Sequence, residues 1–110
     1  MKIPNCENAV VDIRKLQDYC LSVEHLRGRH KARVFASALG MTADDAEALQ
    51  EKLFEIVCND AAVLGELDSY GQRYTLDFLM GWKNNEAVVR SNWIIRTDES
   101  VPRLTSCYVI

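Results

Sequence analysis

The sequence predicts an α+β fold, with three helices packed on one face of a three- or four-stranded antiparallel meander sheet. Apolar residues recur at helical spacing from residue 13 to about residue 58, and they alternate with polar residues from about residue 60 onward. Turns that contain glycine or asparagine separate the segments. Helices followed by a run of strands favour a helical layer on one face of a sheet, and 110 residues suit a single domain over 1–110.

Three helices are predicted in the first half of the chain, over about 13–22, 29–39 and 43–58. Asp12 and Thr42 are suitable N-caps for the first and third helices, because each side chain can accept a hydrogen bond from an exposed N–H. Gly40 can adopt the left-handed conformation that ends the second helix. The apolar stripes comprise Ile13, Leu16, Cys20 and Leu21, then Ala32, Phe35 and Leu39, then Ala46, Leu49, Leu53, Ile56 and Val57.

Three strands are predicted over 72–80, 86–96 and 103–110, since apolar and polar residues alternate in each. Residues 62–67 are a weaker candidate for a fourth strand, because Gly65 interrupts the run. A short strand is also expected at 9–11. Residues 81–85 form the predicted hairpin loop, in which Trp82 is the best candidate for an exposed aromatic side chain.

The net charge of −3 is unevenly distributed along the chain. Residues 1–40 carry seven Lys or Arg and four Asp or Glu, residues 41–70 carry one and eight, and residues 71–110 carry five and four. An acidic chain argues against non-specific binding of nucleic acid, but a local cationic cleft stays compatible with it. Without a long apolar run or a signal-peptide segment, we expect a soluble, cytoplasmic protein that does not contact membranes.

The four cysteines lie far apart, and no CxxC pair occurs. With only two histidines, His25 and His30, the spacing does not favour a metal site, and no cofactor motif is found. Cys20 and Cys58 fall on apolar helix faces, so we expect them to be small buried thiols. Disulfide bonds remain open at this point, although nothing else in the sequence indicates an oxidising compartment.

A dense basic cluster precedes and enters the second predicted helix, with Arg27, Arg29, His30, Lys31 and Arg33. The start of a helix flanked by arginines suits an anion, because free N–H groups and guanidinium groups both bind phosphate. His30 adds a side chain that can exchange a proton near neutral pH. The alternative is a solvated face that forms ion pairs with the acidic third helix.

The polar face of the predicted sheet is the second candidate site, with Arg73, Thr75 and Asp77 on one strand and Arg90 and Asn92 on the next. Such a set can hold a phosphodiester and stabilise its transition state electrostatically. The alternative is ordinary cross-strand pairing, for example between Arg90 and Asp77. On the last strand, Thr105 and Tyr108 point to opposite faces unless a bulge intervenes.

Five segments resemble a small bacterial domain family of unknown function: KLQDYCL (15–21), GRHKARVFASALG (28–40), YGQRYTLDF (70–78), VRSNWIIR (89–96) and VPRLTSCYVI (101–110). That family is similar to C-terminal modules of polymorphic toxins, and its layout resembles the barnase/EndoU/colicin/RelE-type ribonucleases. The resemblance implies metal-independent RNA cleavage. It implies His30 as general acid or base, phosphate binding by Lys31, Arg73 and Arg90, and assistance from Thr105 or Tyr108.

The leading hypothesis is therefore a ribonuclease-like toxin domain, with His30, Arg73, Arg90 and Thr105 as catalytic candidates. The anion-binding candidates are Arg27, Arg29, Lys31 and Arg33. The alternatives are a non-catalytic interaction module whose cationic edge binds an acidic protein, and an immunity-like or accessory phage protein with no activity of its own. Expected partners are RNA or an acidic protein of antitoxin or immunity type, and the edge of the last strand could support oligomers. The enzyme hypothesis requires His30, Arg73 and Arg90 to converge in one cleft.

Overall fold

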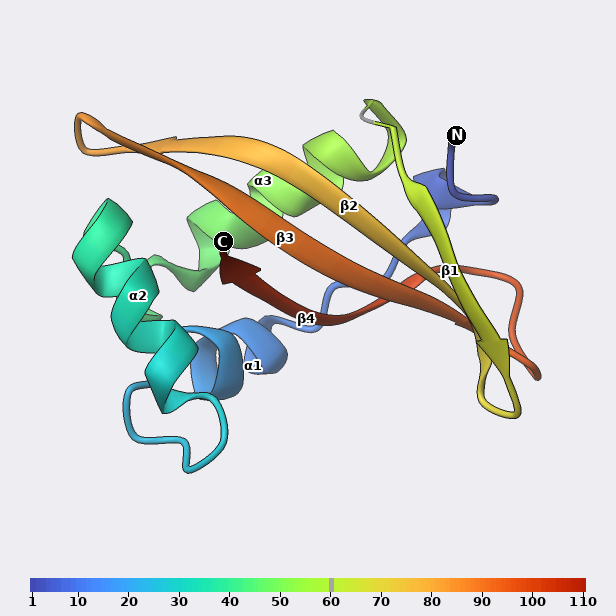
Figure 1. Cartoon of the computed structure of the whole chain (residues 1–110), viewed down its shortest axis with the longest axis horizontal. Coiled ribbons are helices and arrows are strands. Elements are labelled where there is room, and N and C mark those ends of the chain that lie inside the picture. Colours follow the sequence, from blue (N-terminus) through green and yellow to red (C-terminus); the bar gives the residue numbers. More distant parts are fainter. Residues whose placement is uncertain (60) are drawn as a thin grey trace.

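The computed structural model describes residues 1–59 and 61–110, and it confirms the predicted α+β class (Figure 1). The helices are α1 (Ile13–Lys15), α2 (Arg29–Leu39) and α3 (Ala46–Asn59). The strands are β1 (Val63–Asp68), β2 (Gly71–Trp82), β3 (Asn85–Arg96) and β4 (Arg103–Val109). All neighbours are antiparallel in the order β1-β2-β3-β4, and the helices lie on one side of this sheet. No described helix is long and apolar enough to cross a bilayer.

The helices begin and end at the residues that the local sequence indicates, but part of the first helix is π-helical rather than α-helical. Asp12 caps α1 by accepting a hydrogen bond from the Arg14 N–H at 2.9 Å, and Gly40 ends α2 with φ 73°. Thr42 and Asp45 form a capping box before α3, across the short 3₁₀ turn Ala43–Asp45. The first predicted helix is not uniformly α, because Leu16–Cys20 continues α1 as a π-helical turn.

The core lies between the helices and the inner face of the sheet. Alternate residues of β2 and β3 point into it, and Phe35, Leu39, Leu49 and Leu53 meet them from the helices. Burying each of these large side chains contributes about 1.5–3 kcal/mol. The core members from the sheet are Tyr74, Leu76, Phe78, Met80, Val89, Trp93, Leu104 and Cys107.

One buried polar residue, Ser91, is fully hydrogen bonded within this core. Its hydroxyl donates to the Leu76 carbonyl at 2.7 Å and accepts the Trp93 indole N–H at 2.9 Å. The largest core side chain therefore has its polar atom paired, as burial requires.

Two local predictions need correction. Residues 9–11 do not form a strand, because Val10 makes only an isolated parallel bridge with Arg103. Trp82 is half-buried against the core rather than exposed at the hairpin tip. The tip itself consists of Lys83 and Asn84, both with positive φ, as a tight two-residue hairpin turn requires.

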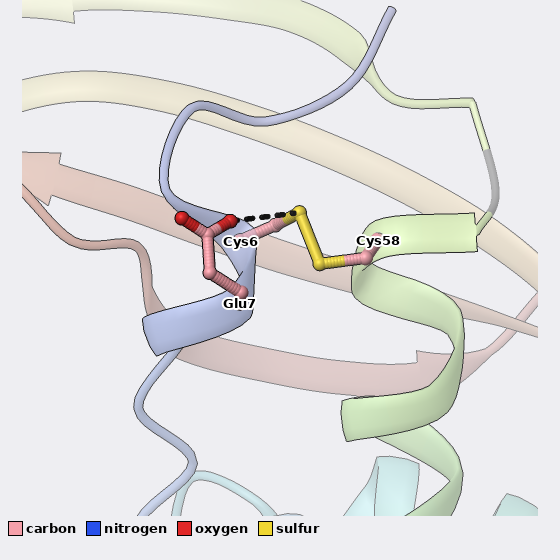
Figure 2. Close-up of side chains that lie close together, drawn as sticks. All are labelled: Cys6, Glu7 and Cys58. Atoms are coloured by element: carbon pink, nitrogen blue, oxygen red, sulfur yellow. Dashed lines mark hydrogen bonds between the residues drawn. A yellow bond between two sulfur atoms is a disulfide. The ribbon is translucent and has the colours of Figure 1, made fainter.

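The cysteines differ from the sequence-based expectation at one position. Cys20 is a buried thiol as predicted, but Cys58 is not, because it forms a disulfide bond with Cys6 (Figure 2). The bond ties the N-terminal arm to the end of α3. Glu7 Oε2 lies 3.9 Å from Cys6 Sγ, and this contact is not a hydrogen bond while the disulfide is formed, since a disulfide sulfur carries no proton. Both sulfurs are bonded to each other and are not free to act as thiolate ligands for a metal.

Candidate functional site

The candidate site is built on the face of the sheet that points away from the helices, close to strand β4. Side chains alternate along a strand, so the residues between the core positions of β2 and β3 share this outer face. Asp77 pairs in register with Arg90, and Arg90 pairs with Tyr108. One row therefore runs across three strands, from Asp77 through Arg90 to Tyr108.

Helix α2 adds a cation to the end of this row. The Lys31 ammonium lies 3.9 Å from the centroid of the Tyr108 ring, which is cation–π geometry. Arg90 donates two hydrogen bonds to Asp77, each 2.9 Å long. This pairing raises the pKa of Arg90, with Tyr108 acting in the same direction, and it holds the pKa of Asp77 below its usual value. Asp77 offsets much of the Arg90 charge, so Lys31 is the less neutralised cation of the row.

A bulge in β4 places Thr105 beside the row. Asn92 pairs with Ser106 and the next residue, Trp93, pairs with Leu104, so Thr105 is the extra residue. Its hydroxyl donates to the Asn92 carbonyl oxygen at 3.1 Å. Without this bulge, Thr105 and Tyr108 would point to opposite faces of the sheet. With it, both side chains can contribute to one site.

A groove of about 910 Å³ lies along the other side of β4 and meets the outer face at Thr105. Its walls come from α1, the π-helical turn, the loop before α2, and β4. The lining residues are Asp12, Arg14, Lys15, Asp18, Tyr19, His25, Leu26, Arg27 and Thr105. Asp12 and Arg14 form an ion pair of 3.0 Å, whereas Lys15 and Arg27 have no ion-pair partner within the described part of the chain.

His25 has a fixed orientation in this groove. Its Nδ1 accepts hydrogen bonds from the backbone N–H groups of Arg27 and Gly28, both at 3.1 Å. Its ring packs edge-on against Tyr19, with 4.7 Å between the ring centroids. Sequence reasoning did not select His25. A signal for it was present in the sequence, because His25 lies three residues before Gly28, the N-cap residue of α2, which has no side chain. A side-chain acceptor at this position can bind the backbone N–H groups that precede the helix.

The structure separates His30, Arg73 and Arg90. His30 is exposed on the solvent side of α2, together with Arg33. Arg73 is held by Asp68 at 2.9 Å, near the β1–β2 turn. Arg73 pairs in register with Ile94, four residues along β3 from Arg90, which puts the two guanidinium-bearing positions about 13 Å apart along the strands.

Three other candidates from the sequence do lie near β4. Lys31 belongs to the outer-face row, Arg27 lines the groove, and Thr105 borders both. Arg29 is half-buried, and its Nε has no hydrogen-bond partner among the described residues. The ion pairs found within 1–59 and 61–110 include none between the basic cluster and α3, so the acidic helix does not neutralise this edge there.

Comparison with known proteins places this architecture in a family. Residues 2–110 match the family described as "Domain of unknown function (DUF6883)". The chain belongs to this family. The predicted relationship to a family of unknown function is thereby confirmed over nearly the whole chain.

A solved structure has a similar fold. It is a chain of a contact-dependent growth inhibition toxin–immunity protein complex from Klebsiella pneumoniae 342, which matches with a TM-score of 0.69. The sequences are 18% identical, and the match covers 96% of each chain. At this identity the likeness establishes the fold alone. No curated protein matches the sequence significantly.

Proposed function

We propose that the DUF6883 chain is a toxin-type domain that cleaves RNA without a metal ion, at the outer-face row beside β4. The observation that carries this proposal is the position of the Lys31 ammonium over the Tyr108 ring, next to Arg90 in the cross-strand row. Two cations and a phenolic hydroxyl thus gather on one surface. This set suits a phosphodiester, whose charge increases in the transition state.

The chemistry is an internal transfer within the RNA strand. The ribose 2′-hydroxyl oxygen attacks phosphorus, the P–O5′ bond breaks, and the products are a 2′,3′-cyclic phosphate and a free 5′-hydroxyl. Water accepts the proton of the 2′-hydroxyl and supplies one to the departing 5′-oxygen. Lys31 and Arg90 offset the charge on the non-bridging oxygens, and the Tyr108 hydroxyl donates a hydrogen bond to one of them.

The likeness in fold to a chain of a toxin–immunity protein complex supports a role in a toxin–immunity system, and the cationic row favours the toxin. Action on RNA would place this role in the cytoplasm of the target cell. A protein that neutralises the toxin would present carboxylates to Lys15, Arg27 and Lys31, because these cations have no ion-pair partner among the described residues. The second candidate function, an interaction module without catalysis, is favoured by the separation of His30, Arg73 and Arg90.

The test is cleavage of tRNA and of a single-stranded RNA oligonucleotide by the purified domain in the presence of EDTA. Tyr108→Phe keeps the ring under Lys31 and removes only the hydroxyl, and we expect it to slow cleavage roughly 100-fold. Lys31→Met should have a similar effect. Lys83→Met makes the same change at the exposed β2–β3 turn and should retain wild-type activity.

A substrate with a single 2′-deoxyribose at the cleavage position should remain intact, because the attacking hydroxyl is missing. If the wild-type domain cleaves neither RNA, the ribonuclease proposal is wrong, and the interaction module becomes the working hypothesis. Equal activity of the wild type and Tyr108→Phe would show that the reaction takes place elsewhere on the protein.

A further inference from the structure

We propose that the groove along β4 is a second phosphate-binding subsite for the RNA strand, in which His25 donates a hydrogen bond from Nε2. This inference rests on the proposed function for the identity of its ligand, the backbone phosphate of a single strand. It assigns no proton transfer to His25. It also assigns the binding role to His25 rather than to His30, the histidine that the sequence favoured.

The hydrogen bonds of His25 determine which ring nitrogen carries the proton. Nδ1 accepts two backbone N–H groups, from Arg27 and Gly28, and so uses its lone pair as an acceptor. In the neutral imidazole the proton therefore lies on Nε2. His25 is therefore oriented to donate a hydrogen bond from Nε2. Nε2 makes no hydrogen bond with any residue that the structure describes.

The loop that carries His25 is held closely against the wall of the groove. A Cβ atom at Gly28 would lie 2.6 Å from the Tyr19 carbonyl oxygen and 3.1 Å from its ring, so this contact requires glycine. The Arg29 N–H donates to the His25 carbonyl at 2.9 Å and closes the turn. Tyr19, which touches both Gly28 and the His25 ring, thus holds the imidazole in its position on the groove wall.

The charges of the groove favour an anion next to His25. Arg14 is occupied by Asp12, and Asp18 is the remaining carboxylate, whereas Lys15 and Arg27 have no ion-pair partner within 1–59 and 61–110. These two cations and the N–H donor of His25 suit one phosphate group.

The position of the groove fits a strand that continues from the reaction site. Thr105 lines the groove and lies three residues from Tyr108 along β4, about 10 Å along the strand. Phosphates of a single RNA strand can therefore reach both sites. One would lie at the row of Lys31, Tyr108 and Arg90, and another in the groove beside His25.

The decisive variant is His25→Asn. The Asn Oδ1 takes the place of Nδ1 and can accept the same two N–H groups, as asparagine does at helix caps, but no group replaces Nε2. His30→Asn makes the same change on the solvent side of α2. Binding is measured by fluorescence anisotropy with a labelled 2′-O-methyl RNA oligonucleotide, which cannot be cleaved through its 2′-oxygen.

We expect His25→Asn to weaken binding roughly tenfold or more, as for a hydrogen bond to a charged group, and His30→Asn to change it less than twofold. Lys15→Met and Arg27→Met should each reduce the slope of log K against log salt by about 0.7, whereas Lys83→Met should not. If His25→Asn does not fold, the salt dependence of RNA binding by Lys15→Met and Arg27→Met still tests the phosphate-binding subsite.

Wild-type affinity in folded His25→Asn, or an unchanged salt slope in Lys15→Met and Arg27→Met, would overturn the subsite. The proposed function fails separately. If the wild type binds the oligonucleotide with the expected losses in the variants but cleaves no RNA, the groove still binds phosphate and the ribonuclease proposal is wrong.

Discussion

The disulfide bond between Cys6 and Cys58 offers the most direct test of how this chain is stabilised. The bond closes a loop across 52 residues. It therefore restricts the unfolded chain much more than the folded one, in which the N-terminal arm is held by other contacts. The Ala62 N–H donates to the Met1 carbonyl at 2.7 Å, and the Val10 N–H donates to the Pro102 carbonyl at 2.8 Å. Removing the bond should leave the fold in place but lower its stability.

The magnitude follows from the length of the loop. Closing a loop of this length removes about 14 cal/mol/K of entropy from the unfolded chain, which is about 4 kcal/mol at 25 °C. A domain of 110 residues unfolds with an entropy of about 230 cal/mol/K near its midpoint. The variant Cys6→Ser/Cys58→Ser should therefore melt about 17 °C below the oxidised wild type.

Thermal unfolding followed by circular dichroism, with and without a reducing agent, measures this difference. Reduction should bring the wild type close to the melting temperature of the double variant, whereas the variant itself should not respond to the reductant. A thiol titration in denaturant should find two thiols, Cys20 and Cys107, before reduction and four afterwards. Four thiols without reduction, or a difference in melting temperature below about 4 °C, would refute the reasoning.

Two further predictions concern the sheet. Gly71→Ala should destabilise the protein by at least about 2 kcal/mol in denaturant unfolding, because φ is 149° and the new Cβ would lie too close to the Ile95 carbonyl oxygen. Gly81→Ala, whose Cβ would meet the Asn85 carbonyl oxygen at an ordinary contact distance of 4.0 Å, is the control and should cost less than half as much. Asp77 contributes stability above its unfolded pKa of about 3.9, and this is lost as pH falls through its lower folded pKa. Asp77→Asn should therefore be less stable than wild type by up to about 1 kcal/mol at pH 7, and the difference should shrink as the pH falls below about 4. A difference that stays the same when the pH falls below about 4 would contradict this account.

The candidate site combines residues that were recognisable in the sequence with others that were not. The basic cluster before α2 was evident, but a cluster does not indicate which member turns toward the sheet. Successive residues on a helix point about 100° apart, so packing Ala32 and Phe35 into the core brings Lys31 beside β4 and leaves His30 in solvent. His25 was overlooked because its role depends on backbone N–H groups, which have no sequence signature of their own.

The sequence by itself determined the order of the elements, the bounds of α2, the cap at Gly40 and the inward-facing residues of β2 and β3. These features depend on local periodicity and on the conformations that single residues permit. Only the tertiary structure decided the bulge at Thr105, the partner of Cys6 and the meeting of Lys31 with Tyr108. Each depends on strand register or on packing between segments that are distant in the chain. The local sequence permits many alternative registers and contacts, and the packing free energy of the whole core selects one of them.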